Sequence, residues 1–156
     1  MKQIDVGQGF FALIDDEDFD RVRAVKWWLV RDPNNFYAKR NLKVGTKWTT
    51  QTLHSFVLRV ARGSRIDHKD HNGLNNQKNN LRPATQRQNC RNRRHTGNRF
   101  GFKGVFFDPR GRRHFGAAVR VGGKRIFAGY FATLEEAAMG YNQKAIEIFG
   151  EFAHLN

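Results

Sequence analysis

The stretch IDHKDHNGLNNQKNNLRPATQRQN, residues 66–89, decides how the middle of this chain folds. It holds few apolar side chains and many Asn, Asp and His. Asp67 and His68 are neighbours, so on a regular strand they point to opposite faces, whereas at a distorted or terminal position they flank one site. Thr85 and the glutamine three residues later form a capping box, which predicts a helix that begins at Thr85. Asn89 then lies near the end of the first helical turn and can face the strand that carries Asp67.

These residue types indicate a hydrolytic site. A carboxylate oxygen and an amide oxygen suit a hard divalent cation such as Mg²⁺, which keeps its remaining positions for water and phosphate. A neutral imidazole beside such a site can take a proton from a water molecule that attacks phosphorus. The alternative is a structural loop in which the Asn and Asp side chains only cap turns.

Four elements of this stretch, in order over 23 residues, resemble the HNH homing endonucleases of phages and mobile introns. That family has an Asp-His pair, a loop with Asn-Asn, an Asn-Leu-Arg run and a Thr-x-x-x-Asn helix. The corresponding elements here are Asp67-His68, Asn75-Asn76, Asn80-Leu81-Arg82 and the segment from Thr85 to Asn89.

The resemblance implies a ββα-metal (HNH) nuclease motif with defined roles. It implies that His68 is the general base that activates water and that Asp67 and Asn89 are metal ligands. Asn80 is implied to orient the His68 strand through a hydrogen bond. Asn89 stands where other branches of the family have His, which favours one Mg²⁺ or Mn²⁺ ion over tightly bound zinc.

Two further histidines lie near this stretch. His54, after Leu53, resembles the Leu-His element of the same family, but Ser55 stands where an Arg often follows. We therefore expect His54 to be structural. For His71 the alternatives are a second polar contact at the motif and an exposed loop residue, and we expect the exposed loop residue.

Charge is the second indication of function. The chain has 28 Lys and Arg against 14 Asp and Glu, a net charge of +14. Residues 61–130 carry 17 of the basic and 3 of the acidic side chains, so the rest of the chain, with 11 of each, is neutral. Clustered cations favour a polyanionic partner because binding releases counterions from phosphates. Nucleic acid is the expected partner, and a solvated basic face is the alternative.

The N-terminal segment shows scaffold features and no chemistry. Residues 9–14 predict an apolar strand, and the acidic run at 15–18 predicts the start of a helix. A turn is predicted at 32–35, and strands at 36–38 and 47–53. The core residues of the predicted helix follow at helical spacing and are Phe19, Val22, Val25 and Trp28.

The C-terminal segment has clearer signals. Strands are predicted at 105–107, 115–121 and 124–131, with a turn at 108–111 and a two-residue hairpin turn at Gly122-Gly123. Thr133 and Glu136 form a capping box, and Gly150 ends the helix that follows. The expected unit is a three-stranded antiparallel sheet with one helix packed across it.

Five runs of this segment carry a family resemblance, namely KGV (103–105), FGAAVR (115–120), RIFAGYF (125–131), EEAA (135–138) and GEFAHLN (150–156). Through these runs the segment resembles the plant ethylene-response-factor (Apetala-type) DNA-binding domain. The resemblance implies that the sheet face lies in the major groove and that Arg120, Arg125 and Phe127 contact DNA. Phe106 and Ala118 differ from the plant residues at their positions, so the plant recognition sequence does not carry over.

Basic residues outside the strands complete the predicted DNA-binding set. The link at 91–99 lacks an apolar period and reads as an arm along a phosphate backbone, or as a solvated linker. The turn between the first two C-terminal strands is longer than in the plant domains. The residues expected to bind DNA from these two places are Arg93, Arg94, Arg110, Arg112 and Arg113.

The expected fold class is α+β, in four parts. These are a small α/β scaffold (1–53), the ββα-metal motif (54–92), a basic linker (93–102) and the sheet-and-helix DNA-binding domain (103–156). No apolar run is long enough to span a membrane, and the first residues do not form a signal peptide. One cysteine excludes an intrachain disulfide and cysteine-rich zinc sites, as suits a cytoplasmic protein of a bacterium or a phage-infected cell.

The expected function is that of a metal-dependent endonuclease that acts on double-stranded DNA, without a small-molecule cofactor, as a monomer or a dimer. A non-catalytic DNA-binding regulator is the first alternative, but all four motif residues are present. An RNA-binding protein is the second. It is disfavoured because no exposed aromatic platform, typical of single-strand readers, is evident in the sequence.

Overall fold

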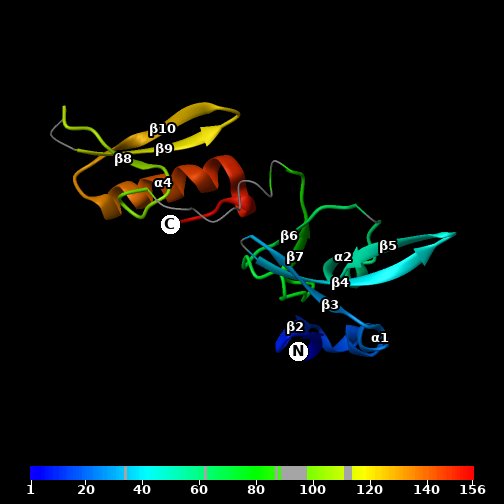
Figure 1. Ribbon diagram of the computed structural model, residues 1–156. Coiled ribbons are helices and arrows are strands. Elements are labelled where there is room, and N and C mark those ends of the chain that lie inside the picture. Colours follow the sequence, from blue (N-terminus) through cyan, green and yellow to red (C-terminus); the bar gives the residue numbers. More distant parts are fainter. Residues whose placement is uncertain (34, 62, 87, 89–97, 111–113) are drawn as a thin grey trace. The chain divides into compact units, whose positions relative to one another are not determined.

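The computed structural model describes residues 1–33, 35–61, 63–86, 88, 98–110 and 114–156. The chain divides into two compact units, Met1–Gln86 and Arg87–Asn156 (Figure 1). The finer boundaries expected from the sequence stay predictions. Several predicted site residues lie outside the described residues, namely Asn89, Arg93, Arg94, Arg112 and Arg113.

The first unit begins with an antiparallel hairpin of β1 (Lys2–Gly7) and β2 (Phe10–Ile14). β2 was predicted and β1 was not, because only Ile4 and Val6 alternate with its polar residues. Both side chains are buried in the first core. The acidic run then forms a 3-10 turn, η1 (Asp16–Asp18), followed by α1 (Phe19–Arg23).

The helix prediction was wrong at its end. α1 stops at Arg23, and Trp28 is the first residue of β3 (Trp28–Asp32), with a side chain that is 39% exposed. Trp27 is the buried tryptophan, at 5%, and its indole Nε1 donates a hydrogen bond to the Val22 carbonyl at 2.9 Å. Trp27 lies between α1 and β3, so neither the helical nor the strand spacing of apolar residues predicts that it is in the core.

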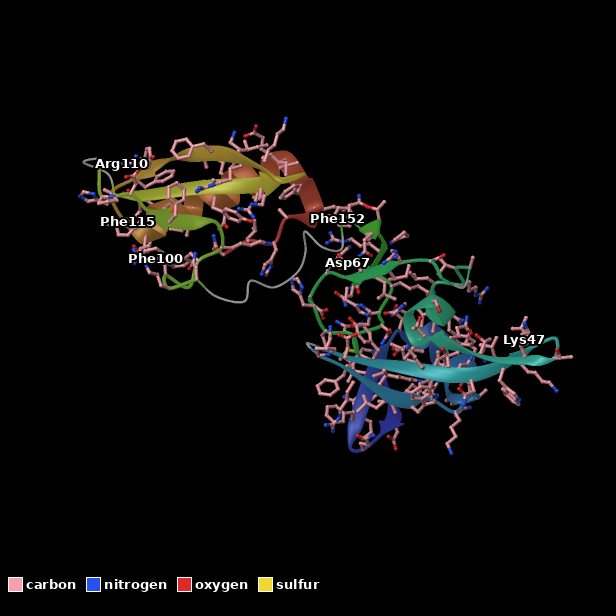
Figure 2. The ribbon with its side chains drawn as sticks, turned by 45° about the horizontal axis from the view of Figure 1, so that its top comes forward. Lys47, Asp67, Phe100, Arg110, Phe115 and Phe152 are labelled. Atoms are coloured by element: carbon pink, nitrogen blue, oxygen red, sulfur yellow. The ribbon has the colours of Figure 1, made fainter. Side chains whose placement is uncertain are left out.

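β3 continues into a longer antiparallel sheet with β4 (Asn35–Val44) and β5 (Lys47–Thr52). The β4–β5 hairpin turns at Gly45, whose φ of 59° favours glycine. Lys47 lies at the far end of this hairpin (Figure 2). The predicted strand at 47–53 ends one residue early, because Leu53 begins α2 (Leu53–Val57).

The HNH-like stretch forms two short strands, β6 (Ile66–His68) and β7 (Leu81–Pro83), which pair antiparallel with His68 opposite Leu81. The loop between them is anchored to β2. The Leu13 amide donates to the Leu74 carbonyl and the Asn76 amide donates to the Leu13 carbonyl, both at 2.8 Å. Gln86 and Gln88 are helical. The complete ββα-metal motif stays a prediction, since most of the segment predicted to form its helix lies outside the described residues.

The second unit has the predicted architecture. β8 (Val105–Phe107), β9 (Phe115–Val121) and β10 (Lys124–Phe131) form an antiparallel sheet in the order β10-β9-β8. α4 (Leu134–Phe149) lies across one face of it and is followed by a 3-10 turn, η2 (Gly150–Phe152) (Figure 1).

The local signals of this unit are confirmed. Gly122 and Gly123 both have positive φ, as the primed hairpin turn requires. The Thr133 hydroxyl accepts a hydrogen bond from the Glu136 amide at 3.1 Å, and Gly150 ends α4 with a φ of 55°. The buried side chains of α4 are Ala137, Ala138, Tyr141 and Ala145.

The mixed architecture, with several small sheets and three helices among the described residues, is compatible with the α+β class. Among the described residues, no helix has the length and apolar character needed to cross a membrane.

The two adjacent tryptophans give a matched test of the first core. Trp27→Ala should lower the free energy of unfolding by about 3–5 kcal/mol, because it leaves a cavity and removes the indole hydrogen bond. Trp28→Ala should lower it by less than about 1 kcal/mol. Urea unfolding followed by circular dichroism measures both, and equal losses would contradict the assignment of Trp27 to the core.

Candidate active site and nucleic-acid surfaces

His68, the predicted general base, is the last residue of β6 and is 5% exposed. Two other rings lie beside its imidazole. The His54 ring, from α2, is 5.2 Å away between centroids at an interplanar angle of 76°, and the Tyr37 ring, from β4, is 5.9 Å away. The Tyr37 and His54 centroids are 6.2 Å apart. The fold thus brings three elements of the first unit together at one imidazole.

Burial favours the neutral form of both imidazoles. It lowers the pKa of His68, while a hydrogen bond to Asn76 and the nearby carboxylates of Asp70 and Asp67 act in the opposite direction. Burial, with the charges of His68 and Lys39, lowers the pKa of His54 to about 3. Only a neutral imidazole has the lone pair that accepts a proton, so His68 is in the form a general base requires.

Asn80 fastens the loop that follows His68. Its side-chain Nδ2 donates to Asp70 Oδ1 and to the Asn75 carbonyl, both at 2.9 Å, and its Oδ1 accepts from the Asp70 amide at 3.1 Å. The Lys69 amide donates to the Asn80 carbonyl at 3.0 Å. The side-chain amide of Asn80 therefore forms hydrogen bonds with the loop that follows His68. That Asn80 thereby orients the strand carrying His68 stays a prediction.

Asp70 is the acceptor at the centre of this loop. Its carboxylate accepts hydrogen bonds from the Asn72 amide at 2.8 Å and from Asn75 Nδ2 at 2.7 Å, in addition to Asn80. Burial alone would raise the pKa of Asp70, but these donors stabilise the charged form and lower it. The loop is thus held by a carboxylate and three asparagines.

Asp67, the predicted metal ligand, is buried in an ion pair. Its Oδ2 accepts from Arg82 Nε at 2.8 Å and from Arg82 Nη2 at 2.7 Å, and Arg82 lies directly opposite on β7. Asp67 is labelled on its strand in Figure 2. Its charge still acts on His68 and Tyr37. A cation at Asp67 would have to share this carboxylate with Arg82.

The site offers few protein oxygens that could hold a metal ion. Among the described residues, no group of three His, Cys, Asp or Glu side chains could hold a metal. Asp67 supplies a carboxylate, and Asn89 lies outside the described residues. The donor chemistry fits Mg²⁺, which leans on one or two protein ligands, and it does not fit a zinc cage. The metal site stays a prediction.

One face of the β3–β4–β5 sheet is a basic surface that sequence reasoning missed. Side chains alternate along a strand, so Tyr37, Lys39 and Lys43 share a face of β4. The unbroken register places Trp28 opposite Lys39 and Trp48 opposite Lys43 on the same face. Trp48 is 72% exposed. From Tyr37 beside His68, this face runs about 20 Å along the hairpin, at about 3.4 Å per residue.

The signal that would have found this surface is local charge. Residues 33–66 contain no Asp or Glu and seven Lys and Arg. Over residues 1–60 the 7 acidic side chains, all at 1–32, offset most of the 10 basic ones, so a charge count over the whole segment does not mark this surface. The second missed feature, the ring contacts of Tyr37 and His54 with His68, depends on long-range folding and leaves no mark in the sequence.

The exposed face of the second unit carries three of the predicted DNA contacts. Arg125 lies opposite Arg120 and Phe127 opposite Ala118, on β10 and β9. The Arg125 guanidinium lies 4.4 Å from the centroid of the Phe106 ring. Gly116 makes room for that ring, since a Cβ there would lie 2.3 Å from Phe106 Cζ. The Arg125 guanidinium is thus held over the face of the Phe106 ring on the exposed side of the sheet.

The same face corrects the expectation that no aromatic platform is present. Phe127 is 49% exposed and Tyr130 is 42% exposed, with ring centroids 4.8 Å apart. Arg110, a further predicted DNA contact, bonds the Asp108 carboxylate through Nε and Nη2, both at 2.9 Å. These hydrogen bonds hold the pKa of Asp108 below its usual range.

The chain is similar to an uncharacterized HNH endonuclease of Acanthamoeba polyphaga mimivirus. The two are 31% identical over 156 residues, which cover 96% of this chain and 76% of the relative. No family model matches the chain, and no solved structure matches it.

The buried histidines predict a dependence of stability on pH. Unfolded histidine titrates near pH 6.5, whereas His54 and His68 have lowered pKa values in the folded unit. Below pH 6.5 the unfolded chain therefore binds more protons, and the free energy of unfolding should fall as the pH is lowered from 7 to 5. The limit is about 1.4 kcal/mol per pH unit for each histidine.

Chemical denaturation at several pH values measures this slope, and His54→Phe should make it shallower. Carboxylates titrate mainly below this window. A free energy of unfolding that stays constant or rises between pH 7 and pH 5 would contradict the neutral, buried state of these rings.

Proposed function

The chain belongs to the HNH endonuclease family, and from the site around His68 we propose that it is a metal-dependent endonuclease that hydrolyses phosphodiester bonds of double-stranded DNA. The observation that carries the proposal is the buried imidazole of His68, which lies at the end of a short strand and is followed by a loop that Asn80 holds through hydrogen bonds. A role in homing of a mobile element is a prediction from the sequence resemblance alone.

In the proposed reaction, His68 takes a proton from a water molecule as the water oxygen attacks the phosphorus. The bond from phosphorus to one bridging oxygen breaks, and that oxygen leaves with a proton from solvent. Asn80 keeps the loop, and with it the end of β6, in place during this transfer. General-base catalysis of this kind contributes about 10²–10⁴-fold to a rate.

A single divalent ion, Mg²⁺ or Mn²⁺, is proposed to be held by Asp67 and Asn89. Such an ion supplies positive charge that stabilises the phosphate oxygens as charge develops on them. Arg82 bonds the Asp67 carboxylate and fixes its orientation.

The same ion pair is the observation that favours the alternative function, a non-catalytic DNA-binding regulator. If the Asp67 carboxylate belongs only to Arg82, neither predicted metal ligand is available among the described residues of the first unit, since Asn89 lies outside them. The response of cleavage to metal ions decides between the two functions.

DNA binding is proposed for two surfaces, one in each unit. On the second unit it is the sheet face with Arg120, Arg125 and Phe127, a use similar to that of the ethylene-response-factor domain. On the first it is the face of the β4–β5 hairpin with Lys39 and Lys43. The further basic residues proposed to contact phosphates are Arg93, Arg94, Arg110, Arg112 and Arg113.

Replacing His68 tests the base. His68→Ala should abolish strand cleavage and change the dissociation constant for DNA by less than about 2-fold, since a general base does not bind a phosphate directly. The matched control is His71→Ala, which removes a histidine side chain from the loop three residues after His68. This variant should keep its cleavage activity. Nicking by folded His68→Ala protein at the rate of the unchanged chain would refute the role.

Metal dependence is tested at the proposed ligands. Asp67→Asn and Asn89→Ala should each raise the Mg²⁺ and Mn²⁺ concentrations needed for half-maximal cleavage by at least about 10-fold. Asp67→Asn is used because its amide oxygen can still accept a hydrogen bond from Arg82, whereas alanine removes that acceptor. Both changes remove the charge that is paired with buried Arg82, a loss that costs about 3–5 kcal/mol, so circular dichroism must show that the variant is folded. An unchanged metal titration in both variants would favour the regulator.

Alanine substitutions on the two proposed DNA-binding surfaces should have different effects on DNA binding. Lys39→Ala with Lys43→Ala should flatten the slope of log affinity against log salt by about 0.9 for each phosphate that is no longer neutralised, for all DNA sequences alike. Arg120→Ala with Arg125→Ala should also reduce base discrimination, by about 1–3 kcal/mol if either reads a guanine edge. Lys144→Ala, on α4, is the control. Salt slopes equal to that of the unchanged chain in both double variants would contradict these surfaces.

A further inference from the structure

The general-base role of His68 leaves two of its ring neighbours unexplained. From their contacts we infer that Tyr37 and His54 are positioning residues that fix the orientation of the His68 imidazole for proton transfer. The inference rests on the proposed role of His68 and adds two residues to the site. It also revises the expectation that His54 only supports the fold.

His68 needs such support because its own backbone restrains it weakly. β6 has three residues and His68 is the last of them. The torsion between the Cβ of a histidine and its ring is broad, so a ring without close neighbours samples a wide range of orientations. The position of the ring nitrogen that accepts a proton therefore depends on what packs against the imidazole.

Tyr37 is fixed against the loop of the site. A Cβ on Gly73 would lie 2.5 Å from Tyr37 Cε1 and 2.3 Å from the Phe36 carbonyl, so the tyrosine ring occupies space that only glycine leaves. Asn35 holds the two segments together, because its Nδ2 donates to the His71 carbonyl at 2.9 Å and its Oδ1 accepts from the Gly73 amide at 3.1 Å.

The same loop is hydrogen-bonded to His68, the proposed general base. The His71 amide donates to the His68 carbonyl at 3.1 Å. Tyr37 thus contacts the His68 ring on one side and packs on the loop that continues from His68 on the other. Any shift of the tyrosine ring is therefore transmitted both to the imidazole and to the turn that follows it.

His54 is fixed by the first turn of α2. Its neighbours Leu53 and Ser55 are buried, and the Ser55 hydroxyl donates to the Thr52 carbonyl at 2.8 Å. The Thr52 hydroxyl in turn donates to the Ser55 oxygen at 2.9 Å. The His54 ring meets the His68 ring in an edge arrangement, which aromatic pairs prefer and which sets a defined angle between them.

The consequence is catalytic because proton transfer is sensitive to placement. A displacement of about 1 Å at a reacting group costs about 10²-fold in rate. Neither Tyr37 nor His54 needs to exchange a proton for this role. What the role requires is a planar ring at each position, so a phenylalanine should serve and an aliphatic side chain should not.

The experiment uses the full chain with four variants, Tyr37→Phe, Tyr37→Leu, His54→Phe and His54→Leu. Leucine keeps much of the buried volume and removes the ring, so the variants stay folded, which thermal unfolding verifies. The first-order rate of supercoiled DNA nicking at saturating protein should fall by about 10–100-fold in the leucine variants and by less than about 3-fold in the phenylalanine variants. The dissociation constant for DNA should change by less than about 2-fold in all four.

A second readout does not depend on cleavage. Nuclear magnetic resonance relaxation of the His68 ring carbons should show greater ring motion in the leucine variants than in the unchanged chain. Equal rates in the phenylalanine and leucine variants at one position would overturn the inference there, because a chemical role of the removed polar group would then explain the effect. Ring motion of His68 that stays unchanged in both leucine variants would overturn it as well. If the unchanged chain cuts no DNA, the proposed function fails while the relaxation data still decide this inference.

Discussion

The hydrogen bonds between Asn80 and the segment after His68 are the constraint on which the site depends. β6 and β7 contribute three residues each, and the loop between them is polar and cannot fold by burying apolar side chains. The amide of Asn80 and the carboxylate of Asp70 take the place of a core there. Leu74 is the apolar exception, and it ties the same loop to the first core. Asn80 is buried whereas Asp70 is exposed, so removal of a partner of the Asn80 side chain leaves a buried polar group unsatisfied, at a cost of about 1–3 kcal/mol.

Local sequence patterns predicted much of the fold. The hairpin at Gly122-Gly123, the capping box at Thr133 and the glycine at the end of α4 were all predicted correctly, because each signal acts within a few residues. The order of the four HNH elements singled out His68, whose role as the general base stays a prediction. Trp27 was missed because it lies between a helix and a strand, and β1 was missed because only two apolar residues mark it.

Contacts between distant segments were beyond what the sequence alone could predict. Tyr37 and His54 reach His68 only through the packing of β4 and α2 against β6. The pairing of Asp67 with Arg82 follows from strand register, which the loop sets. The basic face of the β4–β5 hairpin was hidden by counting charge over too long a window. The two units then give the chain two proposed DNA surfaces, and linking them makes the second binding event intramolecular, which raises overall affinity without new interactions.

Hydrolysis of DNA by this chain is the central claim, and incubation with supercoiled circular DNA tests it most directly. With Mg²⁺ present, the account predicts that the supercoiled form disappears and that nicked or linear DNA accumulates in proportion to the protein added. With a chelator in place of Mg²⁺, the DNA should remain supercoiled although it is still bound. Supercoiled DNA that is bound but stays intact with both Mg²⁺ and Mn²⁺ would contradict the account and identify the chain as a DNA-binding protein without nuclease activity.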